Sequence, residues 1–272
     1  MKKILITNDD GIHAVGIQTL ALRLRDEGYD LLVVAPDRER SASGHSMTMD
    51  RPLRVKKIEK SRLSGDFPAY SCDGTPTDCV IMGIDAMGFK PDLVLSGINC
   101  GPNLGDDITY SGTACAAMEG LIFGYRSMAL SLVCFPGDEK KEFDSAAETA
   151  LEIIKGLAKH PMAEDIFYNV NIPNLPLGDI RGLKLTRKGT RRYRDKITVV
   201  KTPFGGEAYW VGGRIYDELH ENTDVRAIAD GYVSLTPVHL ELTCFSALDA
   251  AKSGTMEAEL SAALKEKVNR KH

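Results

Sequence analysis

Short apolar runs alternate with segments of helical periodicity along roughly the first 160 residues of the chain. The apolar runs predict strands at 4–7, 29–36, 91–99 and 127–134, and the periodic segments predict helices at 17–27, 75–88, 112–124 and 143–160. A continuous apolar run such as Leu31 to Ala35 is typical of a parallel strand buried on both faces. The alternation therefore predicts an α/β fold, with a Rossmann-like, mostly parallel sheet and helices on both faces.

The pattern changes after about residue 165, where the strand-like segments become shorter and more polar. Residues 186–215 are polar and glycine-rich, yet they contain several aromatic side chains: Tyr193, Phe204, Tyr209 and Trp210. We interpret this segment as a protruding β-hairpin arm, because apolar residues on a projecting hairpin usually need a partner surface. The arm predicts at least a dimer.

Strand character returns at 231–243, and a terminal helix is predicted at 256–268. No internal repeat or low-complexity linker divides the chain. We therefore expect a single domain over residues 1–272. Its predicted parts are a core at 1–180, the arm at 181–230, and the returning strand with the C-terminal helix at 231–272.

Composition narrows the classes of protein that this chain can represent. Its 272 residues are 43% hydrophobic and 26% charged, which is ordinary for a soluble globular protein. The formal net charge of -4 gives no general reason to expect binding to nucleic acid or to an anionic membrane. No apolar run approaches the roughly 18 residues of a membrane helix, and no signal peptide is recognisable. We expect a cytoplasmic protein.

The six cysteines do not form a recognisable metal or redox motif. They contain no C-x-x-C pair, and no histidine is spaced from them as in a zinc site. Scattered cysteines in apolar surroundings are usually small buried hydrophobes, and we interpret these in that way.

Polar groups that can bind a cation follow three of the predicted strands. Asp9 and Asp10 follow the first strand, "RERSASG" follows the second, and Asn99 ends the third. Ligands of open parallel sheets bind outside the carboxyl ends of the strands, and hard cations such as Mg²⁺ accept carboxylate, amide and hydroxyl oxygens. A cation would relieve the repulsion between the two carboxylates. The alternative for the Asp-Gly pair is ordinary turn chemistry.

The segment Ser111-Gly112-Thr113 enters a predicted helix rich in small residues. The start of a helix exposes unpaired N–H groups and a partial positive charge, which suits a phosphate group. Taken alone, the segment is equally a good helix cap. Beside a cation site it predicts a phosphate-binding loop.

Several motifs together resemble the SurE family of stationary-phase survival proteins. They are "ITNDDG", "VVAPDRERSASG", "DGTPTDC", "SGINCGPNLGDDITYSGTACAAMEG" and "GYVSLTPV", and they extend from Ile6 to about Val238. The resemblance implies a metal-dependent phosphatase of the 5′-nucleotidase type, which hydrolyses nucleoside 5′- and 3′-monophosphates. It also implies a homodimer or tetramer that exchanges the hairpin arm between subunits.

The resemblance assigns roles to particular residues of this sequence. The implied ligands of one divalent metal ion per subunit, Mg²⁺ or Mn²⁺, are Asp9, Asp10, Ser41 and Asn99. The implied phosphate pocket consists of Asn103, Ser111, Gly112 and Thr113. Asp9 and Asp10 are the candidate catalytic residues, and Asp10 is either a second ligand or the base that orients the attacking water. His13 and His45 are either donors to the leaving alkoxide or ordinary loop histidines.

Other functions remain as alternatives at this point. A nucleotide-binding regulatory protein without turnover would have the same fold, although binding phosphate alone needs no adjacent carboxylates. The basic run "RKGTRRYR" at 187–194 suggests contact with nucleic acid, but a solvated arm or an intersubunit contact explains it better in an acidic chain. We therefore expect no nucleic-acid or membrane partner. Polyphosphate, an anionic chain, is an additional candidate substrate.

Overall fold

The computed structural model describes residues 1–59, 63, 67–160, 162–194 and 197–269. These residues form two compact units, Met1–His239 and Leu240–His272. Residues 195 and 196, which belong to the predicted arm, lie outside the described part of the chain.

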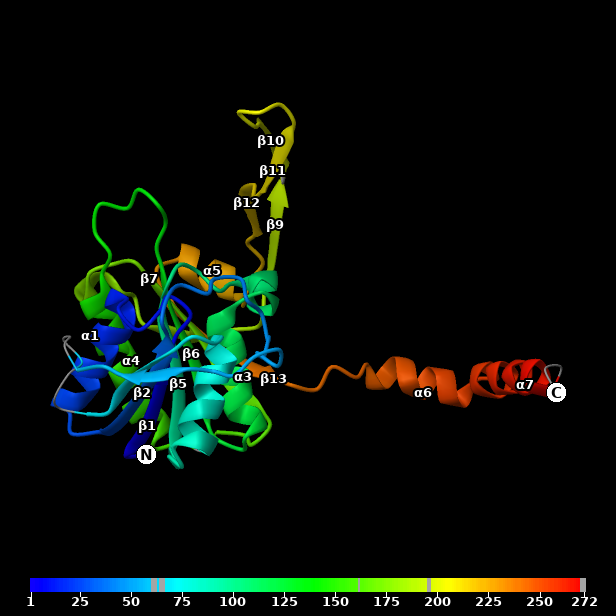
Figure 1. Cartoon of the computed structure of the whole chain (residues 1–272), viewed down its shortest axis with the longest axis horizontal. Helices are drawn as coiled ribbons and strands as arrows, with labels where there is room; N and C mark the ends of the chain where they lie inside the picture. Colours follow the sequence, from blue (N-terminus) through cyan, green and yellow to red (C-terminus); the bar gives the residue numbers. More distant parts are fainter. Residues whose placement is uncertain (60–62, 64–66, 161, 195–196, 270–272) are drawn as a thin grey trace. The chain divides into compact units, whose positions relative to one another are not determined.

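A nine-stranded, mostly parallel sheet is the centre of the first unit (Figure 1). Its strands, in spatial order, are β3 (Val55–Lys57), β4 (Ala69–Cys72), β2 (Asp30–Pro36), β1 (Lys3–Thr7), β5 (Leu93–Cys100), β6 (Ser127–Val133), β7 (Ile166–Pro173), β13 (Val233–His239) and β8 (Leu183–Leu185). Only the β3–β4 and β7–β13 pairs of this sheet are antiparallel. The prediction of an α/β fold with a mostly parallel sheet is confirmed.

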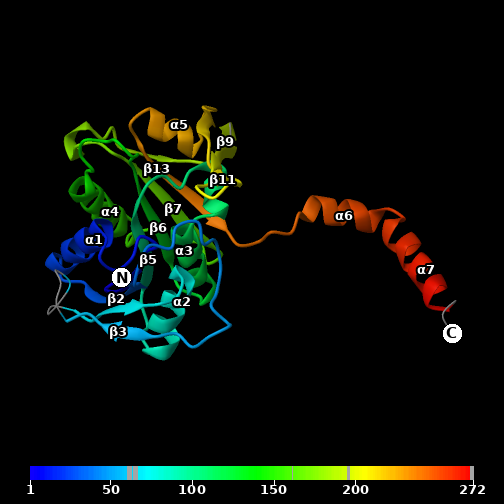
Figure 2. The same cartoon turned by 45° about the horizontal axis from the view of Figure 1, so that its top comes forward.

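Helices cover both faces of the sheet, as the view in Figure 2 shows. The helices are α1 (Val15–Asp26), α2 (Pro76–Ile81) with the π-helical turn η1 (Met82–Ala86), α3 (Gly112–Ile122), α4 (Phe143–Leu157) and α5 (Asp224–Ala229), and the short 3₁₀ helices are η2 (Gly105–Thr109) and η3 (Leu177–Asp179). Helix α1 packs against α4, and α2 packs against α3. Successive strand residues serve opposite faces: Ile4 and Ile6 belong to the core that contains α1 and α4, whereas Leu5 belongs to the core that contains α2.

Local sequence signals explain where two of these helices begin. Thr75 caps α2 by accepting from Asp78 N at 3.1 Å, and the Asp78 carboxylate accepts from Thr75 N at 2.8 Å, which completes a capping box. Ser111 caps α3 by accepting from Ala114 N at 3.0 Å. The Ser111 cap agrees with the sequence prediction, and α2 begins within the predicted helix at 75–88.

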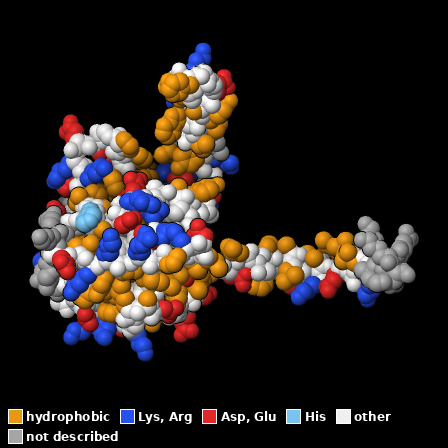
Figure 3. Space-filling model, viewed as in Figure 1, with side chains coloured by type: hydrophobic (Ala, Val, Ile, Leu, Met, Phe, Trp, Pro, Cys, Tyr) orange, Lys and Arg blue, Asp and Glu red, His pale blue; other side chains and the backbone are white. Residues whose placement is uncertain are grey.

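The hairpin arm consists of two antiparallel strand pairs. They are β9 (Thr190–Arg194) with β12 (Arg214–Glu218), and β10 (Ile197–Lys201) with β11 (Glu207–Val211). All side chains of β10 and β11 are exposed, and apolar side chains gather along the arm in Figure 3. The paired strands span residues 190–218, whereas β8 and α5, which the sequence reading included in the arm, pack with the main sheet.

The second unit contains two helices, α6 (Phe245–Ser253) and α7 (Met256–Asn269). The terminal helix agrees with the sequence prediction, and α6 is additional. Leu242, Phe245 and Leu260 are more than half exposed. No helix of the described residues is long and apolar enough to cross a membrane.

Candidate active site

The predicted cation ligands meet at the carboxyl ends of two adjacent strands. Strand β1 pairs with β2 on one side and with β5 on the other, so the strand order reverses at β1. Asp9 and Asp10 follow β1, and Asn99 lies near the end of β5. This edge of the sheet is therefore the switch point at which open α/β sheets bind their ligands.

An irregularity in β5 sets the direction of Asn99. The register between β5 and β6 shifts between Ser96 and Asn99, and such bulges redirect side chains. Asn99 Nδ2 donates to Gly101 O at 2.9 Å. Asn99 Oδ1 has no hydrogen-bond partner among the described residues, so the amide oxygen is available to a ligand.

Asp9 is a buried carboxylate, with 4% of its surface exposed. Thr113 N donates to Asp9 Oδ2 at 3.2 Å, and Thr113 Oγ1 donates to Asp9 Oδ1. Burial raises the pKa of Asp9 to about 6, although the Thr113 hydroxyl lowers it and the Asp10 charge raises it further. A positive charge next to Asp9 would offset the cost of burying the ionised form.

Asp10 is half-buried and is held by the end of β5. Cys100 N donates to Asp10 Oδ2 at 2.8 Å, while Asp10 Oδ1 has no hydrogen-bond partner among the described residues. Burial raises the pKa of Asp10, and the Cys100 N–H partly compensates for this. Both carboxylates are thus held by hydrogen bonds, but of the two only Asp10 has an oxygen without a hydrogen-bond partner among the described residues.

The loop that carries Ser41 is tied to both sides of the site. Arg40 N donates to Asp9 O at 2.7 Å, and Gly44 N donates to Tyr110 O at 3.0 Å. Ser41 itself is exposed, and its hydroxyl donates to Glu39 Oε1 at 2.7 Å. The oxygen of Ser41 keeps its lone pairs, so it can still coordinate a cation.

The start of α3 lies directly against Asp9. A Cβ atom on Gly112 would lie 2.9 Å from Asp9 Cβ and 2.8 Å from Ser43 Oγ, so this approach requires glycine. Gly112 N has no hydrogen-bond partner among the described residues. The N–H group at the first position of α3 and the Ser111 hydroxyl proton therefore remain as donors for an anion.

The structure places two hydroxyl groups, those of Thr113 and Ser43, in ways that the sequence did not indicate. The Thr113 hydroxyl was expected to donate to phosphate, but its proton is directed to Asp9. Ser43, which sequence reasoning did not single out, has a buried hydroxyl without a partner among the described residues. Its position beside Gly112 could be found only once α3 and the loop after β2 were placed together.

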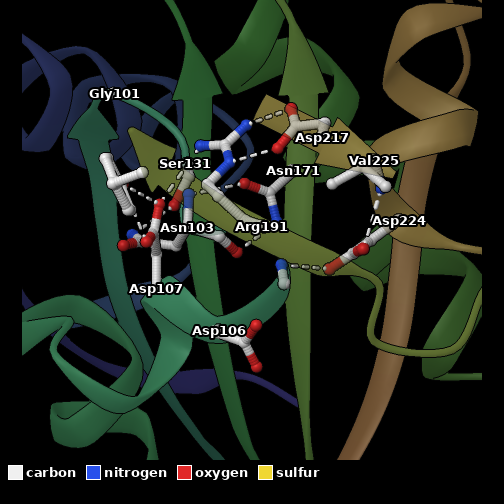
Figure 4. A network of polar contacts seen from close by, with 12 residues as sticks. Gly101, Asn103, Asp106, Asp107, Ser131, Asn171, Arg191, Asp217, Asp224 and Val225 are labelled. Carbon is white, nitrogen blue, oxygen red and sulfur yellow. Dashed lines mark hydrogen bonds and ion pairs between the residues drawn. The ribbon is translucent and has the colours of Figure 1, made fainter. Parts of the chain in front are cut away.

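Asn103 is buried in a polar network that links the loop after β5 to β6 and β7 (Figure 4). Its side chain donates to Ser131 Oγ at 2.8 Å, and its backbone N donates to Asn171 Oδ1 at 2.9 Å. Asn169 and Asn171 donate to its carbonyl at 2.9 and 3.0 Å. Asn103 is therefore a rigid part of the pocket wall.

Five of the eight predicted site residues line a cavity of about 340 Å³, whereas Asp10, Gly112 and Thr113 are not part of its lining. Its lining contains Asp9, Ser41, Ala42, Asn99, Cys100, Gly101, Pro102, Asn103, Asp107, Tyr110, Ser111 and Tyr193. A larger cavity of about 510 Å³ is lined by α4, β8 and β13, but it contains none of the predicted site residues and few polar groups. We therefore assign the site to the smaller cavity.

Asp107 and Tyr193 are cavity residues that sequence reasoning did not assign to the site. Tyr193 Oη donates to Asp107 at 2.8 Å, and the buried Arg191 contacts Asp107 Oδ2 at 3.2 Å. Arg191 also forms two bonds of 2.7 Å with Asp217. Burial and the Asp107 carboxylate raise the pKa of Tyr193 to about 12, so the phenol stays protonated. The base of the arm thus forms part of the cavity wall.

The basic run at 187–194 is largely neutralised within the chain. Lys188 pairs with Asp106, Arg191 with two aspartates, and Arg192 with Glu218 at 2.9 Å. The Arg194 guanidinium lies over the Tyr216 ring at 4.6 Å. These contacts favour a structural role for the run over a nucleic-acid surface.

Neither candidate histidine lines the cavity. His45 Nε2 contacts Glu119 Oε2, on α3, at 2.7 Å. His13 is exposed. Their positions favour the interpretation as loop histidines.

The side chains that are present fit a divalent cation. No group of three His, Cys, Asp or Glu side chains suited to a metal occurs among the described residues, so the candidate ligands are two carboxylates with amide and hydroxyl oxygens. This oxygen set suits a hard cation such as Mg²⁺ or Mn²⁺. The buried Asp9 carboxylate and the free oxygens of Asp10 and Asn99 support that match.

Oxygen-bearing side chains that suit a cation lie beside a helix start at the switch point of a parallel sheet, and this arrangement suits metal-assisted phosphate-ester chemistry. The family model "Survival protein SurE" matches residues 4–195. The chain therefore belongs to the SurE family.

Two curated relatives and one solved structure agree with this membership. A 5′-nucleotidase SurE of Gloeothece citriformis is 45% identical over 251 residues, which are 88% of this chain and 91% of that protein. A 5′/3′-nucleotidase SurE of Escherichia coli is 46% identical over 251 residues, which are 91% and 94% of the two chains. The crystal structure of the SurE protein from Aquifex aeolicus has a TM-score of 0.78 and 42% identity, and the match covers 92% of this chain and 98% of that one.

Proposed function

We propose that this protein is a phosphoric monoester hydrolase that releases phosphate from nucleoside 5′- and 3′-monophosphates. The observation that carries this proposal is the contact between the start of α3 and Asp9, which joins an anion site to a cation site. The names of the relatives, 5′-nucleotidase and 5′/3′-nucleotidase, support the same activity. A regulatory protein that only bound nucleotides would not need a buried carboxylate beside its phosphate site.

We assign the cation ligands to Asp9, Asp10, Ser41 and Asn99, with one divalent ion per subunit. When bound, Mg²⁺ or Mn²⁺ supplies charge neutralisation at a phosphoryl oxygen and makes water a better nucleophile. The free Asp10 Oδ1 can accept a proton from the attacking water or coordinate the ion.

The residues at the start of α3 hold the phosphate in this proposal. Gly112 N and the Ser111 hydroxyl donate to phosphate oxygens, and their fixed positions favour the charge that develops in the transition state. Thr113 acts on Asp9, whose orientation and ionisation it supports. Asn103, held by its hydrogen bonds to Ser131 and Asn171, keeps its part of the cavity wall rigid.

Measuring phosphate release from a panel of nucleotides, with Mg²⁺, Mn²⁺ or a chelator, tests the proposal directly. We expect release from AMP with metal and none with chelator, and Asp9→Asn should be inactive while remaining folded. Polyphosphate belongs in the panel as an additional anionic substrate. Full activity with chelator, or in Asp9→Asn, would contradict the proposed metal site.

Two further properties stay proposals that rest on the sequence and the arm. We propose a homodimer or a tetramer in which the arm is exchanged between subunits, because the side chains of β10 and β11 are exposed. The cytoplasmic location expected from the sequence would be tested by cell fractionation.

A further inference from the structure

The active-site cavity contains an acidic group that the chemistry of phosphate does not explain. Asp107 lines the same cavity as Ser111 and Asn99. A carboxylate without a bound cation repels a phosphate group, and Asp107 is not among the proposed cation ligands, so we place it outside the part of the cavity that holds the anion. It must face a neutral part of the substrate, or serve the structure alone.

The position of Asp107 is fixed relative to the phosphate-binding start of α3. Its carbonyl accepts from Tyr110 N at 3.0 Å and from Ser111 N at 3.1 Å. The residue is therefore one helical turn away from the cap of α3. A group bound at the Asp107 carboxylate would lie beside a phosphate held at Ser111.

Two donors orient the Asp107 carboxylate without filling it. The single Tyr193 hydroxyl lies 2.8 Å from both Asp107 oxygens, and Arg191 Nη1 donates to Oδ2 at 3.2 Å. An ionised carboxylate has about four acceptor positions, so acceptor capacity is left. The side chain keeps 17% of its surface exposed, in contrast to 2% for Arg191.

Hydroxyl groups are the neutral donors that a nucleoside carries next to its phosphate. We propose that Asp107 accepts a hydrogen bond from a ribose hydroxyl of the substrate and so makes the site favour nucleotides that carry ribose hydroxyls. This inference rests on the nucleotidase function proposed above. In it, Arg191 is the positioning residue that holds Asp107.

The test compares kcat/KM for AMP with that for 2′,3′-dideoxyadenosine 5′-monophosphate, which lacks both ribose hydroxyls. A hydrogen bond to a charged acceptor should make wild type favour AMP by about tenfold or more. Asp107→Asn should lower this ratio by about five- to tenfold, because a neutral amide is the weaker acceptor. Hydrolysis of the dideoxy substrate shows that the variant is folded and its metal site assembled.

Two matched variants separate this role from a structural one. Asp106→Asn changes the neighbouring aspartate, which is exposed and pairs with Lys188, and should keep the wild-type ratio. Tyr193→Phe removes one donor from Asp107 and should keep or increase the ratio. A fall in the Tyr193→Phe ratio equal to that of Asp107→Asn would assign the ribose contact to the phenol and overturn the proposal.

The outcomes distinguish this inference from the proposed function. If wild type releases no phosphate from either nucleotide, the nucleotidase function itself fails. If wild type hydrolyses both with equal kcat/KM, the function stands and the role of Asp107 is overturned. Equal losses on both substrates in Asp107→Asn would show that the residue serves only the structure.

Discussion

Asp9 and Thr113 are 104 residues apart in the chain, yet both oxygens of the Asp9 carboxylate accept hydrogen bonds from Thr113. One bond comes from the backbone and the other from the hydroxyl. The end of the first strand and the first turn of α3 are thereby joined. The proposed cation and phosphate sites therefore share one rigid contact.

Thr113→Val should remove the hydroxyl donor with little change in side-chain shape. Because partners that orient a ligand typically contribute 10- to 100-fold to metal affinity, we expect a loss of about that size for Mn²⁺. Isothermal titration measures it, and thermal unfolding shows whether the fold is kept. Thr113→Ser retains the hydroxyl and should behave like wild type. Unchanged Mn²⁺ affinity in Thr113→Val would show that the bond does not support a metal site.

Gly112→Ala tests the close approach of α3 to Asp9. The added Cβ would lie 3.0 Å or less from atoms of Asp9 and Ser43, so the helix start must shift. We expect lower phosphatase activity and a weaker response of the melting temperature to Mn²⁺. Gly156→Ala is the matched control, since its Cβ would meet no atom within 4 Å. That substitution near the end of α4 should stabilise the protein by about 0.5–1 kcal/mol at unchanged activity.

The contribution of Asp9 to the stability of the metal-free protein should fall as the pH rises from about 4 to 7. The pKa of Asp9 is raised from 3.8 to about 6 in the folded state, so the folded state binds the proton more tightly than the unfolded state. This contribution is fully present below pH 3.8 and is lost as the pH passes about 6, a change of about 3 kcal/mol.

Urea unfolding in chelator, from pH 4 to 7, compares wild type with Asp9→Asn. The difference in unfolding free energy between the two should grow in favour of the variant as the pH rises. Using this difference cancels the titration of other groups. A difference that stays constant across this pH range would contradict the raised pKa of Asp9.

Removing the outer part of the arm should lower the oligomeric state. Replacing residues 197–211 with a short glycine linker deletes the exposed strands β10 and β11 but keeps Arg191 and Asp217. Light scattering during size-exclusion chromatography measures the mass before and after. If the intact protein is already monomeric, the arm is not an intersubunit contact. A matched change of Val199 and Trp210 to serine should weaken association without shortening the chain.

The sequence predicted the core of the fold because its signals there are local. Continuous apolar runs predicted β2 and β5, and the predicted helices at 75–88 and 112–124 begin within one residue of the observed starts of α2 and α3. The last two strands at one end of the sheet, β3 and β4, lack such a pattern, and several of their side chains are only partly buried or exposed. Strand β4 forms by pairing with β2, and β3 forms by pairing with β4. These pairings depend on the assembled sheet, so the local sequence does not reveal them.

The residues of the candidate site likewise fall into those that the sequence could predict and those that it could not. The residues at strand ends and at the helix cap could be predicted, because topology alone brings Asp9, Asn99 and Ser111 to one edge of the sheet. Asp107 and Tyr193 could not be predicted as cavity residues, since their meeting depends on how the arm folds back on η2. The proton of Thr113 is a further example, because its direction depends on a single rotamer.

The positions of these contacts along the chain have a consequence for protein synthesis. The proposed metal ligands and the phosphate-binding turn all lie within the first 113 residues, whereas the two side chains that donate to the Asp107 carboxylate lie 84 and 86 residues after it. The ribosome therefore synthesises the proposed metal ligands and the phosphate-binding turn long before it synthesises the residues that contact the Asp107 carboxylate. In the nascent chain, the residues proposed for hydrolysis of the phosphate ester therefore precede the residues that orient Asp107, the group proposed to select the substrate.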